Sequence, residues 1–186
     1  MEMDLPPTPP PAEPLTIFHR EEDWCCAGWQ RLFIQVWHGA ANAERAQIVC
    51  DAMAHFERRH ASGVASVIVL GKDATVPDAG ARAVFASEAR RIEGGLLGLA
   101  YLADFPGFKG SAMRGVLTAL RVVARETFAS RVFGDRQEAS TWLAELLAPA
   151  AVGETGAAQP SRVEIEAAEI RLAIASASEK LRLPLP

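Results

Sequence analysis

Few polar side chains in this sequence are spaced as a reaction centre requires, and the most informative ones lie in two short turns. Residues 71–78 (GKDATVPD) follow an apolar run, and residues 107–111 (GFKGS) combine glycines with a lysine and a serine. The second turn has neither the G-x-x-x-x-G-K-[ST] order nor the G-x-G-x-x-G order of phosphate-binding loops. Free backbone N–H groups before a helix can nevertheless hold an anion. Lys109, Gly110 and Ser111 are therefore candidates for an anion site, with ordinary cap and turn chemistry as the alternative.

The histidines and cysteines form no recognisable metal or nucleophile pattern. His55 and His60 are close in sequence, but on a regular helix they point roughly 140° apart. No C-x-x-C accompanies them. Cys25, Cys26 and Cys50 are odd in number and are expected to be free, reduced thiols. We expect no metal, no cofactor and no catalytic centre, with a Cys–His pair assembled in space as the open alternative.

Length and charge set limits on the class of protein. The 186 residues, 49% of them hydrophobic, suffice for one well-buried domain with tails. A net charge of -4 and scattered Lys and Arg predict no nucleic-acid partner. No apolar run approaches the ~20 residues of a membrane helix, and the acidic, proline-rich start does not resemble a secretory signal. We therefore expect no membrane span and a cytoplasmic location.

The elements that must position these turns follow from hydrophobic periodicity. Short strands come first and suggest an antiparallel start, and helices then alternate with strands, which favours right-handed crossovers and a mainly parallel mixed sheet. The expected strands are residues 15–19, 23–30, 32–37, 67–70, 96–103 and 130–133. The expected helices are residues 42–61, 78–94, 111 onward and 135–148, with Asn42, Asp78, Ser111 and Asp135 as N-caps.

Polar and aromatic residues near the antiparallel edge have ordinary explanations. The charged residues Arg20, Glu21 and Glu22 predict a solvated turn. The tryptophans nearby are expected in the core, with an interface role as the alternative; they are Trp24, Trp29 and Trp37.

The two ends of the chain differ from the domain at residues 15–148. Residues 1–14 are expected to be a disordered proline-rich tail, and residues 149–161 a flexible linker. Residues 162–183 are expected to form an amphipathic helix with apolar positions at 4-3 spacing: Val163, Ala167, Ile170, Ile174, Ala177 and Leu181. We expect this helix to fold back on its own domain, with a homodimer formed through it as the alternative.

The order of elements and residues 64–85 (VASVIVLGKDATVPDAGARAVF) resemble the STAS domain, the family of anti-sigma-factor antagonists and of cytoplasmic portions of sulfate transporters. In that family an apolar strand leads through a short turn to a D-S-x-G motif at the start of a helix. Here Gly80 matches, while Pro77 stands at the acidic position and Asp78 at the phosphorylatable serine. The resemblance covers roughly residues 15–147, and residues 107–143 look like uncharacterised bacterial STAS-like proteins.

The resemblance implies a single STAS-like α/β domain with about four helices plus the C-terminal helix, acting as a non-enzymatic regulatory, signalling or scaffolding module. Asp78 would then present a fixed negative charge where relatives carry a phosphate, beside its simpler role as a cap. The expected partner-binding residues are Lys72, Asp73, Thr75, Asp78 and Arg82. The alternative is a small-ligand or anion-binding protein in which residues 71–73 and 104–111 converge at the carboxyl ends of parallel strands.

Overall fold

The computed structural model describes residues 14–91, 95–124, 128–148 and 160–182. The predicted tail and linker lie almost entirely outside the described residues, as does Gly94, where the second helix is expected to end. These predictions therefore remain predictions.

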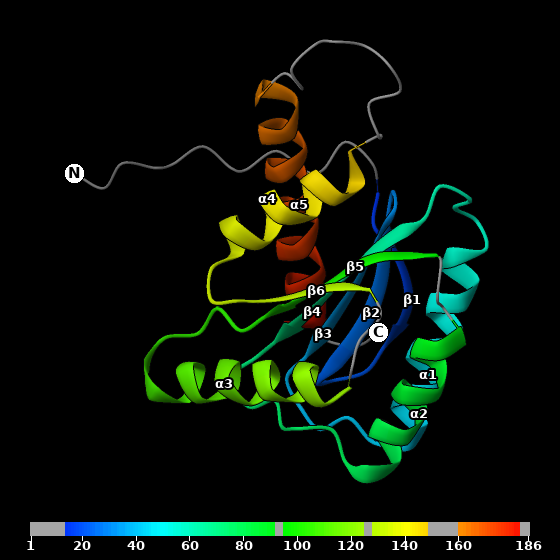
Figure 1. Cartoon of the computed structure of the whole chain (residues 1–186), viewed down its shortest axis with the longest axis vertical. Helices are drawn as coiled ribbons and strands as arrows, with labels where there is room; N and C mark the ends of the chain where they lie inside the picture. Colours follow the sequence, from blue (N-terminus) through cyan, green and yellow to red (C-terminus); the bar gives the residue numbers. More distant parts are fainter. Residues whose placement is uncertain (1–13, 92–94, 125–127, 149–159, 183–186) are drawn as a thin grey trace.

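One six-stranded sheet forms the middle layer of the molecule (Figure 1). Its strands lie side by side in chain order, and they comprise β1 (Thr16–Arg20), β2 (Trp24–Trp29), β3 (Leu32–Trp37), β4 (Val64–Leu70), β5 (Leu96–Leu102) and β6 (Ala129–Phe133). The pairs β1–β2 and β2–β3 are antiparallel, whereas β3 to β6 are parallel neighbours. The predicted mixed, mainly parallel sheet is confirmed.

Layers cover both faces of the inner strands. Every residue of β2 and β3 is buried. In β3, Ile34 and Val36 enter the core on one face, while Phe33 and Trp37 enter the core on the other. Successive side chains of a strand point to opposite faces, so a strand apolar at every position needs cover on both.

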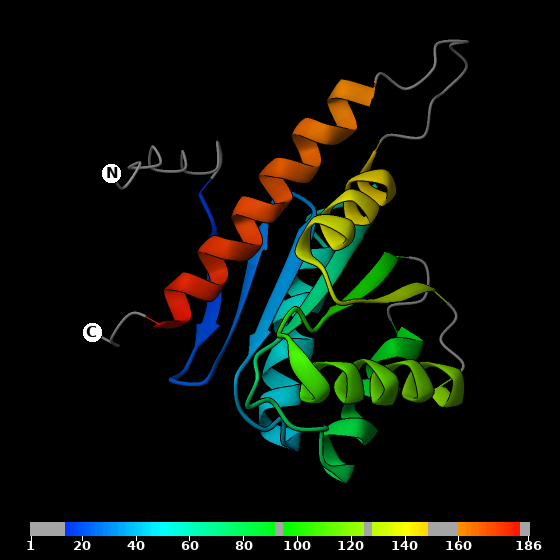
Figure 2. The same ribbon diagram turned by 90° about the vertical axis from the view of Figure 1, so that its left-hand side faces the viewer.

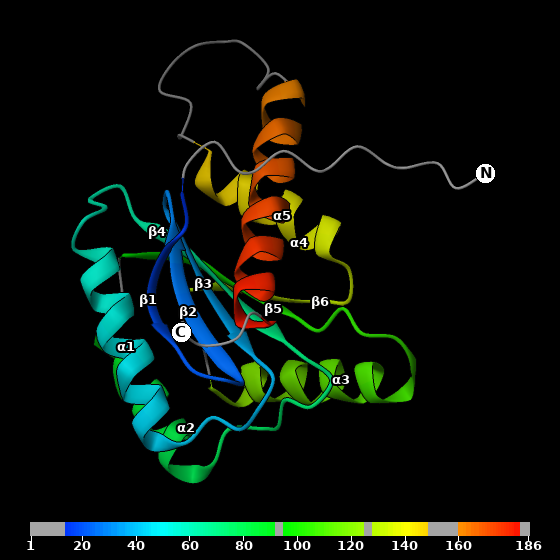
Figure 3. The ribbon, with the colours of Figure 1, turned by 180° about the vertical axis from the view of Figure 1, so that it is seen from behind.

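Helices α1 (Ala43–Glu57) and α2 (Ala79–Arg91) lie against one face, beside each other (Figures 1 and 3). Both begin at a predicted cap. The Asn42 side chain accepts a hydrogen bond from the Arg45 amide at 2.9 Å, and Asp78 accepts one from the Ala81 amide at 2.7 Å. Each carboxyl or amide oxygen satisfies one of the free N–H groups of a first helical turn.

Helix α1 ends four residues earlier than the sequence predicts, at Glu57 rather than residue 61. The amides of Arg59 and His60 bond to the carbonyls of Phe56 and Glu57, three residues back. This tighter pattern closes the helix before Gly63, whose φ of 82° lies in the left-handed region that glycine adopts freely.

Helices α4 (Arg136–Leu147) and α5 (Pro160–Arg182) cover the opposite face (Figures 1 and 2). Asp135 caps α4 as predicted, accepting a hydrogen bond from the Glu138 amide at 2.9 Å. Helix α5 packs against α4, β2 and β3. Its buried seam consists of Ala167, Ile170, Ala173, Ile174, Ala177 and Leu181. The C-terminal helix therefore folds back on its own domain.

Helix α3 (Gly107–Ala124) lies at one end of the molecule, against β6 (Figure 1). The prediction that Ser111 caps this helix is wrong, because the helix already begins at Gly107. Gly110 lies inside the first turn so close to the Phe105 carbonyl oxygen that a Cβ would stand 2.1 Å from it. The missing side chain lets the helix start directly after Pro106, and Ser111 becomes a helical residue.

Candidate functional site

The loop between β4 and α2 carries most of the predicted site residues. All five of the predicted partner-binding residues are exposed; they are Lys72, Asp73, Thr75, Asp78 and Arg82. The loop backbone is nevertheless held firmly. The Gly71 amide donates to the Trp37 carbonyl at 2.7 Å, the Asp78 amide donates to the Ala41 carbonyl at 3.2 Å, and the Ala74 side chain is buried.

The predicted anion site is part of a helix instead of a turn that precedes one. Lys109, Gly110 and Ser111 all belong to the first turns of α3. Ser111 Oγ accepts a hydrogen bond from Arg114 at 3.1 Å, and Lys109 Nζ lies 3.7 Å from an Asp73 carboxylate oxygen. The structure thus brings the two predicted loops together through one exposed ion pair.

Asp73 also lines a cleft of about 760 Å³. We call it the acidic cleft, and its lining residues are Arg20, Glu21, Glu22, Asp23, His38, Arg45 and Asp73. These residues come from the β1–β2 turn, the end of β3, the first turn of α1 and the β4–α2 loop. The carboxyl ends of the parallel strands β3 and β4 therefore contribute to the cleft, as is usual for ligand sites in α/β sheets.

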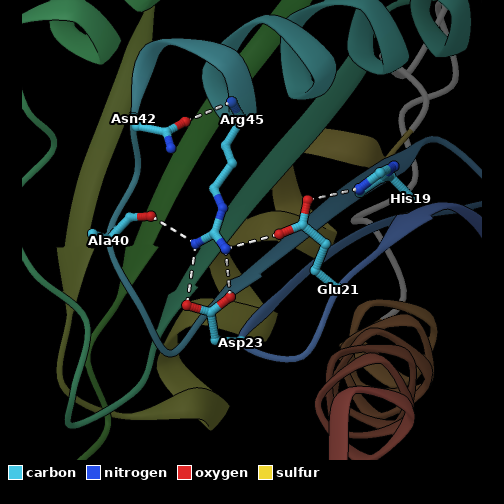
Figure 4. A network of polar contacts seen from close by, with 6 residues as sticks. All are labelled: His19, Glu21, Asp23, Ala40, Asn42 and Arg45. Carbon is cyan, nitrogen blue, oxygen red and sulfur yellow. Dashed lines mark hydrogen bonds and ion pairs between the residues drawn. The ribbon is translucent and has the colours of Figure 1, made fainter. Parts of the chain in front are cut away.

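Arg45 organises one wall of the acidic cleft (Figure 4). Its guanidinium group reaches Asp23 with both terminal nitrogens, at 3.1 and 2.9 Å, and Glu21 at 2.8 Å. It also donates to the Ala40 carbonyl at 2.9 Å. His19 lies 3.2 Å from the second oxygen of Glu21. The planar fork of an arginine suits such multiple contacts and fixes the β1–β2 turn against α1.

The contacts in this network shift the pKa values of its charged groups. Burial alone would raise the pKa of Glu21, but the contacts with Trp24, His19 and Arg45 outweigh it and lower that pKa. The bonds to Asp23 and Glu21 raise the pKa of Arg45. Both charges therefore persist over the physiological pH range and neutralise each other.

Stacked aromatic rings contact the His19 and Arg45 side chains of this network. The His19 ring stacks on Trp24 at 4.7 Å between ring centroids, and Trp24 stacks on Trp37 at 4.8 Å. Arg45 lies over Trp24 at 5.9 Å. Among the described residues no acceptor lies within hydrogen-bonding geometry of the buried Trp24 indole N–H, although Trp24 contributes to lowering the pKa of Glu21. These two tryptophans are core residues, and Trp29 is equally buried.

Sequence reasoning missed the acidic cleft. Glu21 and Glu22 were expected to be merely solvated, and Arg45 received no role. The available signal is the run at residues 20–23, which pairs one arginine with three consecutive acids. Gly39 is a second signal, since a Cβ there would lie 1.7 Å from an Asp23 carboxylate oxygen. A larger residue at position 39 would displace that carboxylate from its present place.

The three cysteines are free and buried. Burial raises the pKa of Cys25 to about 11 and those of Cys26 and Cys50 to about 12. The thiols therefore stay protonated at neutral pH, which disfavours the Cys–His nucleophile that the sequence left open. Within the described ranges, no three His, Cys, Asp or Glu side chains gather as a metal ligand set. No helix in the described part of the chain is long and apolar enough to span a membrane.

The comparisons with known proteins concern the fold. No family model matches the chain, and no curated protein matches it. A solved structure from Shewanella loihica PV-4, described as an uncharacterized protein from the DUF3478 family with a SpoIIAA-like fold, is similar at 14% identity with a TM-score of 0.42, over 70% of this chain and 92% of that chain. Its description names a fold and no activity.

Proposed function

We propose that the protein is a non-enzymatic regulatory or scaffolding module that binds a protein partner through residues 72–78 and the start of α2. The observation that carries this proposal is a rigid loop with an exposed apolar tip. Val76 is 43% exposed, although the same loop buries Ala74 and is bonded to the β3–α1 connection. An apolar side chain that a fixed loop holds in solvent offers a partner a small apolar contact with a polar rim around it.

The loop is suited to binding because little of its backbone freedom remains to be lost. Ordering side chains and loops is one of the main costs of association. Asp78 adds a carboxylate that is held in place by its cap to α2. Arg82 donates to the Pro77 carbonyl at 2.6 Å and fastens the same turn from the helix side.

A pull-down from a native lysate tests this proposal. The bait variants are Val76→Asp, which places a charge on the apolar tip, and Asp78→Asn, which removes a charge but keeps a good N-cap. Ile17→Asp is the matched control, because Ile17 is an apolar residue of comparable exposure (37%) on the edge strand. We expect Val76→Asp to lose proteins that the parent and Ile17→Asp both recover. If all baits recover the same proteins, residues 72–78 do not bind the partner.

The alternative, an anion or nucleotide site between residues 71–73 and 104–111, gains less support. Lys109, the cation expected to hold the anion, has an Asp73 carboxylate oxygen 3.7 Å away, and that negative charge repels an anion. The cleft next to Asp73 is lined by more carboxylates than guanidinium groups. We expect no thermal shift with a panel of nucleotides and simple anions, whereas a ligand at about 100 times its dissociation constant would add ~2.7 kcal/mol. A clear shift would restore this alternative.

A further inference from the structure

We propose that the acidic cleft receives a lysine or arginine side chain of the protein partner, from a segment that places apolar residues next to that cation. This inference rests on the proposed function and specifies the chemistry of the partner. Asp73 belongs both to the loop with the exposed Val76 and to the lining of the cleft. A partner seated on the loop therefore also contacts a residue that lines the cleft.

The charges of the cleft are unbalanced in favour of a cation. Four carboxylates and two guanidinium groups line it. Arg45 is already committed to Glu21 and Asp23. Glu22 is exposed, and Asp73 has a 3.7 Å pair with Lys109 in which both side chains are more than 60% exposed. Such exposed pairs are weak and exchange readily for a better partner.

The cleft is also open and shaped in advance. Its volume of about 760 Å³ leaves room for a long, flexible side chain. The contacts of Arg45 with Asp23, Glu21 and Ala40 fix the wall that this side chain would meet (Figure 4). Since this wall is already fixed, complementary charges there can act on both the rate and the specificity of association.

Apolar residues flank the charged region. Phe108 is 90% exposed at the start of α3 and immediately precedes Lys109, whose ammonium group reaches Asp73. Val76 lies three residues beyond Asp73 in the loop. A large aromatic side chain left in solvent is a typical anchor for a partner. Together these residues favour a segment that carries a basic residue beside aliphatic or aromatic ones.

Selection from a random peptide display library on the immobilised full-length chain tests this proposal. We expect the enriched peptides to share a Lys or Arg close to an aliphatic or aromatic residue. Enrichment of acidic or uncharged peptides on the same surface would overturn the proposal.

Fluorescence anisotropy with one labelled, enriched peptide then locates the site. The double variant Glu22→Lys/Asp73→Lys should raise its Kd by about tenfold or more, and added salt should raise the Kd for the parent. The matched control is Glu145→Lys/Glu179→Lys, which changes the net charge equally at exposed positions on α4 and α5. Circular dichroism should show the same melting temperature for the parent and both double variants.

The outcomes separate this inference from the proposed function. If Val76→Asp abolishes binding while the cleft variant binds as well as its control, the loop binds the partner and the cleft proposal is wrong. If the cleft variant alone loses binding, the cleft binds cations but Val76 does not contact the peptide, and the apolar part of the proposed loop surface is wrong. If Val76→Asp and the cleft variant both bind like the parent, both proposals fall.

Discussion

Replacement of Ile174 by alanine should weaken the domain substantially. Ile174 is fully buried in the core beneath α5, together with Ile170, and that core also contains residues of β2, β3 and α4. Removing its outer carbons loses about 0.8 kcal/mol per buried CH₂ and leaves a cavity. The surrounding helices and sheet can relax only in part. We therefore expect the free energy of unfolding to fall by about 2–5 kcal/mol.

Urea unfolding followed by tryptophan fluorescence measures this loss. With a slope of about 2 kcal/mol/M, the midpoint should fall by roughly 1–2.5 M. Two variants calibrate the result. Ile174→Val should cost about 0.5–1.5 kcal/mol. Glu179→Ala, at an exposed position of α5, should stay within about 0.5 kcal/mol of the parent.

The mass in solution distinguishes the two ways in which α5 was expected to be buried. If α5 packs on its own domain, Ile174→Ala lowers the midpoint without changing the mass. A midpoint equal to that of Glu179→Ala would refute the inference that α5 completes the core. A smaller mass for the variant would show instead that α5 holds two copies together.

Three further perturbations have defined outcomes. Arg31 donates to the Leu147 carbonyl and to the carbonyls of residues 62 and 63, so Arg31→Gln should cost about 1–3 kcal/mol in urea unfolding. Folding raises the thiol pKa values from 9.0 to about 11–12, so the native state binds more protons above pH ~9. Stability should therefore fall as pH rises from about 9 to 11, and less steeply in Cys50→Ala; an unchanged slope would contradict this. Gly39→Ala should displace Asp23 and lower the melting temperature, and equality with the parent would show that the turn adapts freely.

Much of the fold is predictable from local signals. The caps Asn42, Asp78 and Asp135 lie at the predicted positions, because a short polar side chain followed by an apolar period of 3.6 has few other uses. The strand at residues 32–37 is predictable for a similar reason, since alternating large side chains specify a covered sheet. The start of α3 is not, because the feature that decides it is the contact of Gly110 with the Phe105 carbonyl. Periodicity contains no information about that contact.

The acidic cleft cannot be predicted from local sequence patterns, and the reason is different. Its lining combines residues 20–23, 38, 45 and 73, which approach one another only after β1–β2, β3 and β4 have paired. Arg45 illustrates the point, since it is an unremarkable helical residue in the sequence. Its role follows from partners on a strand turn more than 20 positions away. A sequence motif could therefore indicate the β4–α2 loop but not the cleft beside it.

The loop at residues 72–78 and the acidic cleft are both held by hydrogen bonds to the end of β3 and the short connection between β3 and α1. The Trp37 and Ala41 carbonyls anchor the loop through the amides of Gly71 and Asp78. The Ala40 carbonyl accepts from Arg45, which holds the cleft wall. A shift of this connection would move both surfaces together, so a partner that engages both meets one rigid unit. Binding to the loop therefore carries little additional ordering cost at the cleft, and contacts at the two places should reinforce each other.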